Sequence, residues 1–202
     1  MIFTLFSPDG EEGYPGKLSV SVTYVLRADN ALEMIFEGVT DAPTHVNLTN
    51  HAFFNLTGDF AKTVSGHLLR LDACSLIECD ENLLPIGRMI DLQNDSLGFH
   101  GDMSIGEAIA RSRQLSVNDG GISQAYAFNE GTEHSIYLFE PMSGRNLRIV
   151  TDCPSVQVYN AYLMDGSDKG KGGVALNRFS GIALEPLGFP DAPNTTQFPT
   201  TS

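Results

Sequence analysis

The chain has 202 residues, of which 25 are acidic and 12 are basic, so its formal net charge is -13. This charge repels phosphate backbones and anionic lipids, which argues against nucleic acid or a membrane surface as a partner. A hydrophobic content of 42% is enough for one sizeable core, and we expect a single domain over residues 1–202.

The three cysteines do not have the pattern of a disulfide framework or a structural zinc site. Cys74, Cys79 and Cys153 are an odd number without a C-x-x-C pair. No apolar run has the length of a signal peptide or of a membrane span. We therefore expect a cytoplasmic protein in a reducing compartment, with no metal.

Short apolar runs in the first part of the chain predict β-strands. Residues 2–6 form one such run, which ends at the turn-rich segment 7–16. Over residues 18–26, apolar residues alternate with serine and threonine, as in a strand that buries one face. Residues 28–30 then have the composition of a hairpin turn that leads to a strand over residues 32–36.

The later part of the chain continues this rhythm and adds one helix. Ser104 and Glu107 have the spacing of a capping box, which predicts a short helix over residues 104–111. Pro85-Ile86-Gly87 predicts a turn. Many short strands with few helices are typical of an antiparallel β-sandwich or barrel. The further predicted strands lie at residues 67–71, 75–78, 120–128, 136–139, 147–150, 156–159 and 181–185.

The segment from Val46 to Leu56 places polar side chains within an apolar run. It contains three asparagines, one threonine and His51. Burying an amide or an imidazole costs free energy unless the group finds a hydrogen-bond partner. This suggests that these polar residues have a specific role at their positions. The run predicts a strand that breaks near His51 and resumes at Phe53, with neighbouring asparagines fixing the tautomer of the histidine. The alternative is a histidine that is satisfied in the core or at a turn.

A second polar residue ends the predicted strand at residues 181–185. Glu185 follows an apolar run, and Pro186 keeps it in an extended conformation. Apolar surroundings disfavour the charged form of a carboxyl group, which moves the pKa of Glu185 toward the range useful to a general base. The alternative is an exposed carboxylate at a strand end.

Taken together, the two segments resemble the aldose 1-epimerase (galactose mutarotase) family. Residues 47–56 match the family's Asn-Leu-Thr-Asn-His segment and the aromatic residue, Phe, Asn and Leu that follow it. Leu184-Glu185 and residues 190–194 match its Leu-Glu strand end and its Pro-Asp-x-Pro-Asn loop. Weaker matches extend the resemblance over nearly the whole chain, at residues 7–16, 80–87 and 156–159.

The resemblance implies a large antiparallel β-sandwich that interconverts the α and β anomers of free aldoses such as galactose or glucose, with no metal or organic cofactor. His51 would be the general acid that protonates the ring oxygen, and Glu185 the base that takes the proton from the C1 hydroxyl. Gln157 matches a sugar-contacting glutamine of the family. Ser123 and Asn50 are the other residues expected to bind the sugar.

The chain departs from the family pattern in three respects. The family has a longer N-terminal portion, which supplies an Asn-Arg pair and a second active-site histidine. It also has further strands beyond the position of Ser202. Ser123 stands where the family has an aspartate, and a serine brings no charge and less reach. We therefore expect weaker sugar binding and exposed sheet edges that favour self-association.

Three functions are compatible with these residues. The first is an aldose 1-epimerase-like enzyme that keeps its acid and base, with activity that is reduced or lost. The second is a non-catalytic carbohydrate-binding or interaction module of the same fold. The third is a mutarotase for a hexose 6-phosphate, for which Arg145 and Arg148 are the nearest basic candidates. Two arginines three residues apart on a strand more often face solvent.

Overall fold

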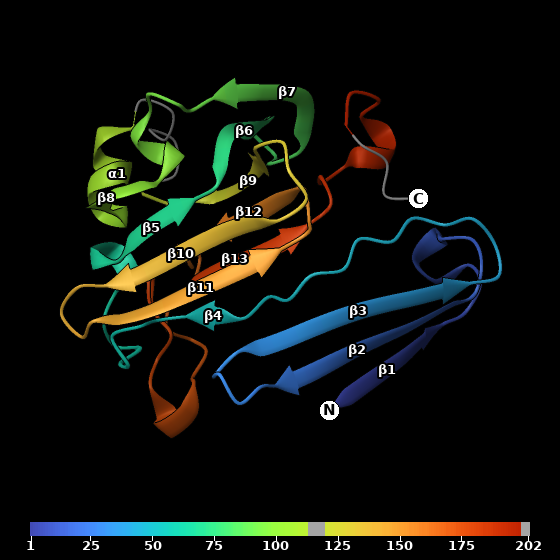
Figure 1. Cartoon of the computed structure of the whole chain (residues 1–202), viewed down its shortest axis with the longest axis horizontal. Helices are drawn as coiled ribbons and strands as arrows, with labels where there is room; N and C mark the ends of the chain where they lie inside the picture. Colours follow the sequence, from blue (N-terminus) through green and yellow to red (C-terminus); the bar gives the residue numbers. More distant parts are fainter. Residues whose placement is uncertain (113–119, 199–202) are drawn as a thin grey trace. The chain divides into compact units, whose positions relative to one another are not determined.

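The computed structural model describes residues 1–112 and 120–198, which form antiparallel strands with one short α-helix (Figure 1). Its contacts divide into two compact units, of which one is Met1–Leu48 and the other begins at Thr49 and includes the rest of the described chain. The predicted all-β antiparallel fold is confirmed. That residues 1–202 act as a single domain stays a prediction.

The first unit is a three-stranded sheet in the order β1-β2-β3. Its strands are β1 (Ile2–Ser7), β2 (Leu18–Leu26) and β3 (Leu32–Thr40), and all of its pairings are antiparallel. The strands predicted over residues 2–36 are therefore confirmed, including the hairpin turn between β2 and β3. A short 3-10 helix, η1 (Glu11–Gly13), lies in the connection between β1 and β2.

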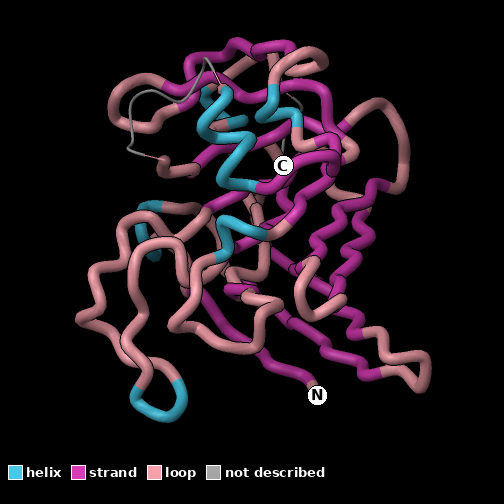
Figure 2. The backbone as a smooth tube through the Cα atoms, turned by 90° about the vertical axis from the view of Figure 1, so that its left-hand side faces the viewer, coloured by secondary structure: helices cyan, strands magenta, loops and turns pink. Residues whose placement is uncertain are grey.

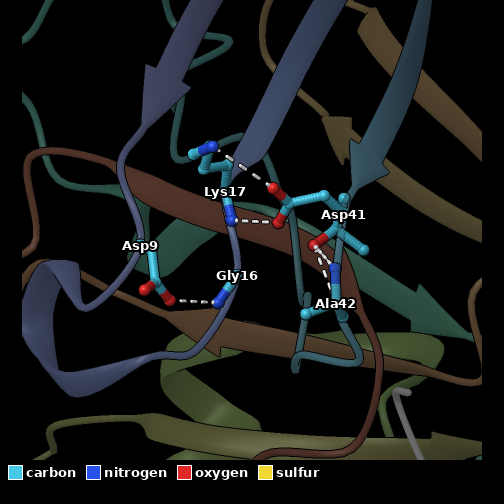
Figure 3. A network of polar contacts seen from close by, with 6 residues as sticks. Asp9, Gly16, Lys17, Asp41 and Ala42 are labelled. Carbon is cyan, nitrogen blue, oxygen red and sulfur yellow. Dashed lines mark hydrogen bonds and ion pairs between the residues drawn. The ribbon is translucent and has the colours of Figure 1, made fainter.

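Carboxylates hold the loop at one end of this sheet (Figure 3). Asp9 accepts the backbone N–H of Gly16 at 2.7 Å, and Asp41 accepts that of Lys17 at 2.7 Å. Gly16 has a φ of +82°, and a Cβ at this position would lie 2.9 Å from the Thr40 hydroxyl oxygen. The turn between β1 and β2 is thus tied to the end of β3, and only glycine fits where the two approach.

The second unit contains two sheets and the α-helix. The four-stranded sheet has the order β11-β10-β5-β8, and the six-stranded sheet has the order β4-β13-β12-β9-β6-β7. Figure 2 shows that the helices are short segments between strands. The elements are β4 (Phe53–Phe54), η2 (Val64–Gly66), β5 (Leu68–Leu71), β6 (Ala73–Cys79), β7 (Pro85–Asp91), η3 (Ser96–Gly98), β8 (His100–Ser104), α1 (Ile105–Arg111), β9 (Ser123–Phe128), β10 (His134–Glu140), β11 (Arg145–Thr151), β12 (Ser155–Tyr159), η4 (Lys171–Gly173), β13 (Ile182–Leu187) and η5 (Ala192–Asn194).

Alternate residues of both sheets face each other across one hydrophobic core. Leu69 and Leu138 come from the four-stranded sheet, and Val158 and Leu184 come from the six-stranded sheet. Because successive side chains of a strand point to opposite faces, burial of Val158 and Leu184 turns their neighbours outward. The outer face of the six-stranded sheet therefore carries the odd-numbered residues of β12 and β13, and these include Gln157.

The predicted capping box is present at the start of α1. The Ser104 hydroxyl accepts the backbone N–H of Glu107 at 3.3 Å, and the Glu107 carboxylate accepts the backbone N–H of Ser104 at 3.0 Å. The helix buries Ile105 and Ala108 against the core. None of the helices within residues 1–112 and 120–198 is long and apolar enough to cross a membrane.

The turn predicted at Pro85 to Gly87 is wrong. Pro85 begins β7 and pairs with Cys79, and the turn is complete before it. The Asp80 carboxylate closes this turn by accepting the N–H groups of Asn82 at 2.8 Å and Leu84 at 3.0 Å. A proline suits the first residue of a strand, since it has no N–H to offer to the ladder.

The first half of the strand predicted around His51 is also wrong. Residues 46–52 contain no strand, and only Phe53–Phe54 form β4. The Asn50 side chain gives the reason, because its Oδ1 accepts the N–H of Ala52 at 3.1 Å and replaces a strand partner. His51 still lies next to a strand, two residues before β4.

The cysteines can be described only in part. Cys79 and Cys153 are free thiols, and burial raises the pKa of both. The side chain of Cys74 lies outside the described part of the structure, as do residues 113–119 and 199–202. Within the described residues, no group of three or more His, Cys, Asp or Glu side chains is placed to hold a metal ion.

We predict that Ser104→Ala lowers the free energy of unfolding by about 1 kcal/mol, because it removes the oxygen that caps α1. Urea unfolding followed by circular dichroism measures this change. Ser104→Thr keeps a capping hydroxyl and is the matched control, which should lose less. Equal stability of Ser104→Ala and the parent chain would show that the cap contributes nothing.

Candidate active site

The pairing of β4 with β13 brings the predicted acid and base together. Phe53 pairs with Ala183, and continuing this antiparallel register by two residues places His51 opposite Glu185. His51 Nε2 lies 3.4 Å from Glu185 Oε1. The histidine side chain is 54% exposed and the glutamate side chain only 9%. The two residues therefore form one polar pair whose carboxylate is shielded from water and whose imidazole is open to it.

The environment of Glu185 favours exchange of a proton. Burial raises the pKa of this carboxyl group, and the charge of a protonated His51 opposes the rise. A carboxylate with a raised pKa is a stronger base than an exposed one. The two side chains are thus close enough that the charge on one changes the proton affinity of the other.

Gln157 and Ser123 lie on the same outer face, on the next two strands of the sheet. Gln157 of β12 pairs with Glu185 of β13, and Tyr159 of β12 pairs with Ser123 of β9. Gln157 Nε2 donates to Ser123 Oγ at 3.3 Å. The structure thus brings these two predicted sugar-binding residues into contact with each other and onto the face that carries Glu185.

Asn50 precedes His51 in the loop before β4. Its side-chain oxygen accepts the N–H of Ala52, so this oxygen shapes the loop that carries the histidine. Asn50 is half-buried. A role for it in sugar binding stays a prediction.

Two aromatic rings lie beside His51, and neither was predicted as a site residue. The ring centroid of Phe53 lies 5.0 Å from that of His51, and the centroid of Tyr159 lies 6.2 Å from it. Tyr162 packs against Tyr159 in turn, at 5.8 Å. Alternation along β12 could have identified Tyr159, because it lies two residues after Gln157 and shares its face. These rings restrict the positions open to the imidazole.

Arg145 and Arg148 do not form a shared site for a phosphate group. They lie three residues apart on β11, so they start from opposite faces of the strand. Arg145 Nη1 donates to the carbonyl oxygens of Leu56 at 3.0 Å and Thr57 at 3.1 Å. Arg148 Nη2 donates to Ser135 Oγ at 3.2 Å. Each arginine is engaged with a different neighbouring segment.

Comparison with known proteins gives consistent matches. A family model described as aldose 1-epimerase matches residues 1–202. The galactose mutarotase of Homo sapiens is 33% identical over 199 residues, which are 98% of this chain and 56% of that protein. The aldose 1-epimerase of Haemophilus influenzae is 32% identical over 194 residues, which are 95% of this chain and 56% of that protein.

Solved structures agree with these matches. An aldose epimerase homologue from C. elegans superimposes with a TM-score of 0.87 at 25% identity, over 99% of this chain and 59% of that one. A galactose 1-epimerase from Lactobacillus acidophilus superimposes with a TM-score of 0.72 at 24% identity, over 99% of this chain and 58% of that one. The chain thus spans a little more than half the length of the relatives that it matches.

We predict that Glu185→Gln raises the free energy of unfolding at about pH 7. A carboxyl group whose pKa is raised in the folded state destabilises the fold as the pH rises from the ordinary pKa of 4.5 through the folded-state pKa. The gain should therefore vanish well below pH 4.5, where the glutamate is protonated in both states. Urea unfolding at the two pH values measures it.

Glu140→Gln is the matched control and should have the opposite sign. Hydrogen bonds from Ser143 hold the pKa of Glu140 below its ordinary value, so the charged form stabilises the fold above that value. Neutralising it should lower the stability at about pH 7. Destabilisation by Glu185→Gln at that pH would contradict the assignment of Glu185 as a buried carboxylate whose charged form is disfavoured.

Proposed function

Because the chain belongs to the aldose 1-epimerase family, we propose that it interconverts the α and β anomers of free aldoses, with galactose and glucose as substrates. The observation that carries this proposal is the 3.4 Å contact between His51 Nε2 and Glu185 Oε1. In anomerisation, protons move at the ring oxygen and at the C1 hydroxyl oxygen, and both atoms are bonded to the same carbon. A proton donor and a proton acceptor in contact suit this chemistry.

We assign the two proton transfers to His51 and Glu185. Glu185 takes the proton from the C1 hydroxyl while protonated His51 gives a proton to the ring oxygen. The bond between C1 and the ring oxygen then breaks, and an aldehyde forms at C1. Rotation about the C1–C2 bond presents the other face of the aldehyde, and closure with the reverse transfers restores both side chains.

The residue types suit these roles. An imidazole titrates near neutral pH, so it can give a proton and recover it within one catalytic cycle. Burial of Glu185 raises its pKa and thereby its basicity. General acid or base assistance of this kind is typically worth ~10²- to 10⁴-fold in rate.

We propose that Gln157, Ser123 and Asn50 bind the hydroxyl groups of the sugar. An amide both donates and accepts hydrogen bonds, as does a hydroxyl, so Gln157 and Ser123 match the groups of an uncharged sugar. Their mutual hydrogen bond is long, at 3.3 Å, and a sugar hydroxyl can replace it. The proposed mechanism uses no metal and no organic cofactor.

A non-catalytic carbohydrate-binding module of the same fold is the second candidate. The observation that favours it is Ser123, which brings a neutral hydroxyl where the family resemblance implies a charged carboxylate. Neutral hydrogen bonds contribute less than those to charged groups, so sugar affinity is expected to be low. Retention of the His51–Glu185 pair favours the enzyme.

We propose a cytoplasmic location, because the three cysteines do not have the pattern of a disulfide framework. We also propose self-association through sheet edges, because β1 and β3 each pair on one side only within the described residues. The charge of -13 supports the absence of nucleic-acid and membrane partners.

We predict that His51→Asn and Glu185→Gln each lower the enzyme-catalysed rate of mutarotation by ~10²-fold or more, because each removes one proton transfer. Polarimetry of freshly dissolved α-galactose measures the rate above the uncatalysed background. The exposed residues His45 and Glu130 provide the matched controls His45→Asn and Glu130→Gln, which should keep the parent rate. A folded parent chain that does not accelerate mutarotation would leave the binding module as the remaining candidate.

We predict that Ser123→Asp tightens sugar binding by about fivefold, because a hydrogen bond to a charged group is worth roughly 1 kcal/mol more than a neutral one. Ser123→Ala should weaken binding. Isothermal titration with galactose measures both, and it does so whether or not the chain is catalytic. Unchanged affinity in both variants would exclude Ser123 from the sugar site.

A further inference from the structure

A buried histidine that the proposed mechanism does not use lies at the core-facing end of the four-stranded sheet. His67 immediately precedes β5 and is 0% exposed. Leu69 pairs with Leu138, and continuing this register by two residues places His67 opposite Glu140 at the end of β10. Glu140 is also buried. An imidazole and a carboxylate thus lie opposite each other at one end of the inner face of this sheet.

The backbone of Leu56 is bound to this histidine. The Leu56 N–H donates to His67 Nε2 at 3.0 Å. A ring nitrogen that accepts a hydrogen bond carries no proton, so the proton of the neutral imidazole is on Nδ1. Nδ1 is buried and has no hydrogen-bond partner among the described residues. The bond to Leu56 therefore requires a neutral His67, because a charged imidazole has no accepting nitrogen.

The carbonyl group of Leu56 is held from the adjacent hairpin. Ser143 Oγ and Arg145 Nη1 donate to this oxygen at 3.1 Å and 3.0 Å. Glu140 in turn accepts the backbone N–H groups of Met142 and Ser143, which fixes the hairpin. The backbone N–H and carbonyl groups of Leu56 are thus both bound by side chains that belong to or adjoin the four-stranded sheet.

Leu56 is connected to the active-site histidine by a very short strand. β4 has two residues, and only Phe53 and Phe54 pair with β13. His51 lies two residues before β4 and Leu56 lies two residues after it. Two rungs of ladder give little resistance to sliding or fraying, so the ends of this segment need other anchors.

We propose that His67 is a positioning residue, whose neutral imidazole fixes Leu56 and thereby holds β4 and His51 in place beside Glu185. Only the expected effect of His67 on the reaction rate rests on the proposed catalytic role of His51. Alongside the hydrogen bonds from Ser143 and Arg145, the His67 imidazole links the loop after β4 to the four-stranded sheet, and this bond exists only when His67 is uncharged.

The charges around His67 determine its response to pH. Glu140 of β10 is the carboxylate that acts on it, Arg145 of β11 binds the same loop, and Glu107 of α1 is engaged by Ser104. Burial lowers the pKa of His67 and Glu140 opposes this, so the neutral form persists below the ordinary value of 6.5. The contribution of the neutral His67 imidazole to the stability of the fold is complete above pH 6.5. It is lost as the pH falls through the lower pKa of the folded state.

The test compares His67→Leu and His67→Gln with the parent chain by ¹⁵N NMR of the Leu56 amide and the His51 imidazole. Leucine removes the acceptor, whereas the glutamine side-chain oxygen reaches the position of Nε2 and does not titrate. His134→Leu is the matched control, because His134 is also buried in this unit but lies beside Asp72 and stacks on Phe128. Mutarotation is measured in parallel.

We expect His67→Leu to shift the Leu56 amide and the His51 imidazole resonances and to lower kcat by roughly 10- to 100-fold with little change in KM. His134→Leu should change neither resonance. His67→Gln should keep the parent rate near neutral pH and should abolish the acid-induced shift of the Leu56 amide. This last result decides the question if His67→Leu does not fold.

Unchanged Leu56 and His51 resonances in a folded His67→Leu would overturn the proposal, as would an acid-induced Leu56 shift in His67→Gln equal to that of the parent chain. These readouts need no catalysis. A parent chain without mutarotase activity would therefore refute the proposed function while the resonances still decide the role of His67.

Discussion

The alignment of β4 with β13 is the constraint on which the candidate site depends. Two backbone pairings, Phe53 with Ala183 and Phe54 with Ile182, set the register that places His51 opposite Glu185. A shift of one residue would turn each side chain of β4 to the other face of the sheet. The proposed acid and base would then no longer meet.

The surrounding structure compensates for the shortness of this strand. The buried Asn55 side chain donates to the carbonyl oxygens of Lys62 at 2.9 Å and Ser180 at 2.8 Å, and Ser180 lies two residues before β13. Each such bond contributes about 0.5–1.5 kcal/mol, and leaving its partners unpaired in a buried position would cost more. Side-chain hydrogen bonds just after β4 thus help to hold this segment in place, because its ladder is only two residues long. Burial of Glu185 acts in the opposite direction, since the fold holds a carboxyl group where its charged form is disfavoured.

Local sequence patterns identified those parts of the molecule that local interactions determine. The alternation over residues 18–26 and the Ser104–Glu107 spacing each describe an interaction within a few residues, and both predictions hold. The turn at Pro85 was misplaced because Asp80, five residues earlier, closes it. Tyr159 and His67 were not singled out, because their roles come from contacts with side chains and backbone outside their own strands, which the local pattern does not show. The juxtaposition of His51 and Glu185 likewise depends on strand register, and only the family resemblance indicated it.

In the proposed mechanism His51 and Glu185 act as one acid–base unit, and a double-variant cycle tests this most directly. The rate of α-galactose mutarotation is measured for the parent chain, for His51→Asn, for Glu185→Gln and for the two substitutions combined. Residues that act as a unit show strongly non-additive losses, so the double variant should be about as slow as the slower single variant. Losses that multiply independently, or single variants as fast as the parent, would contradict the account.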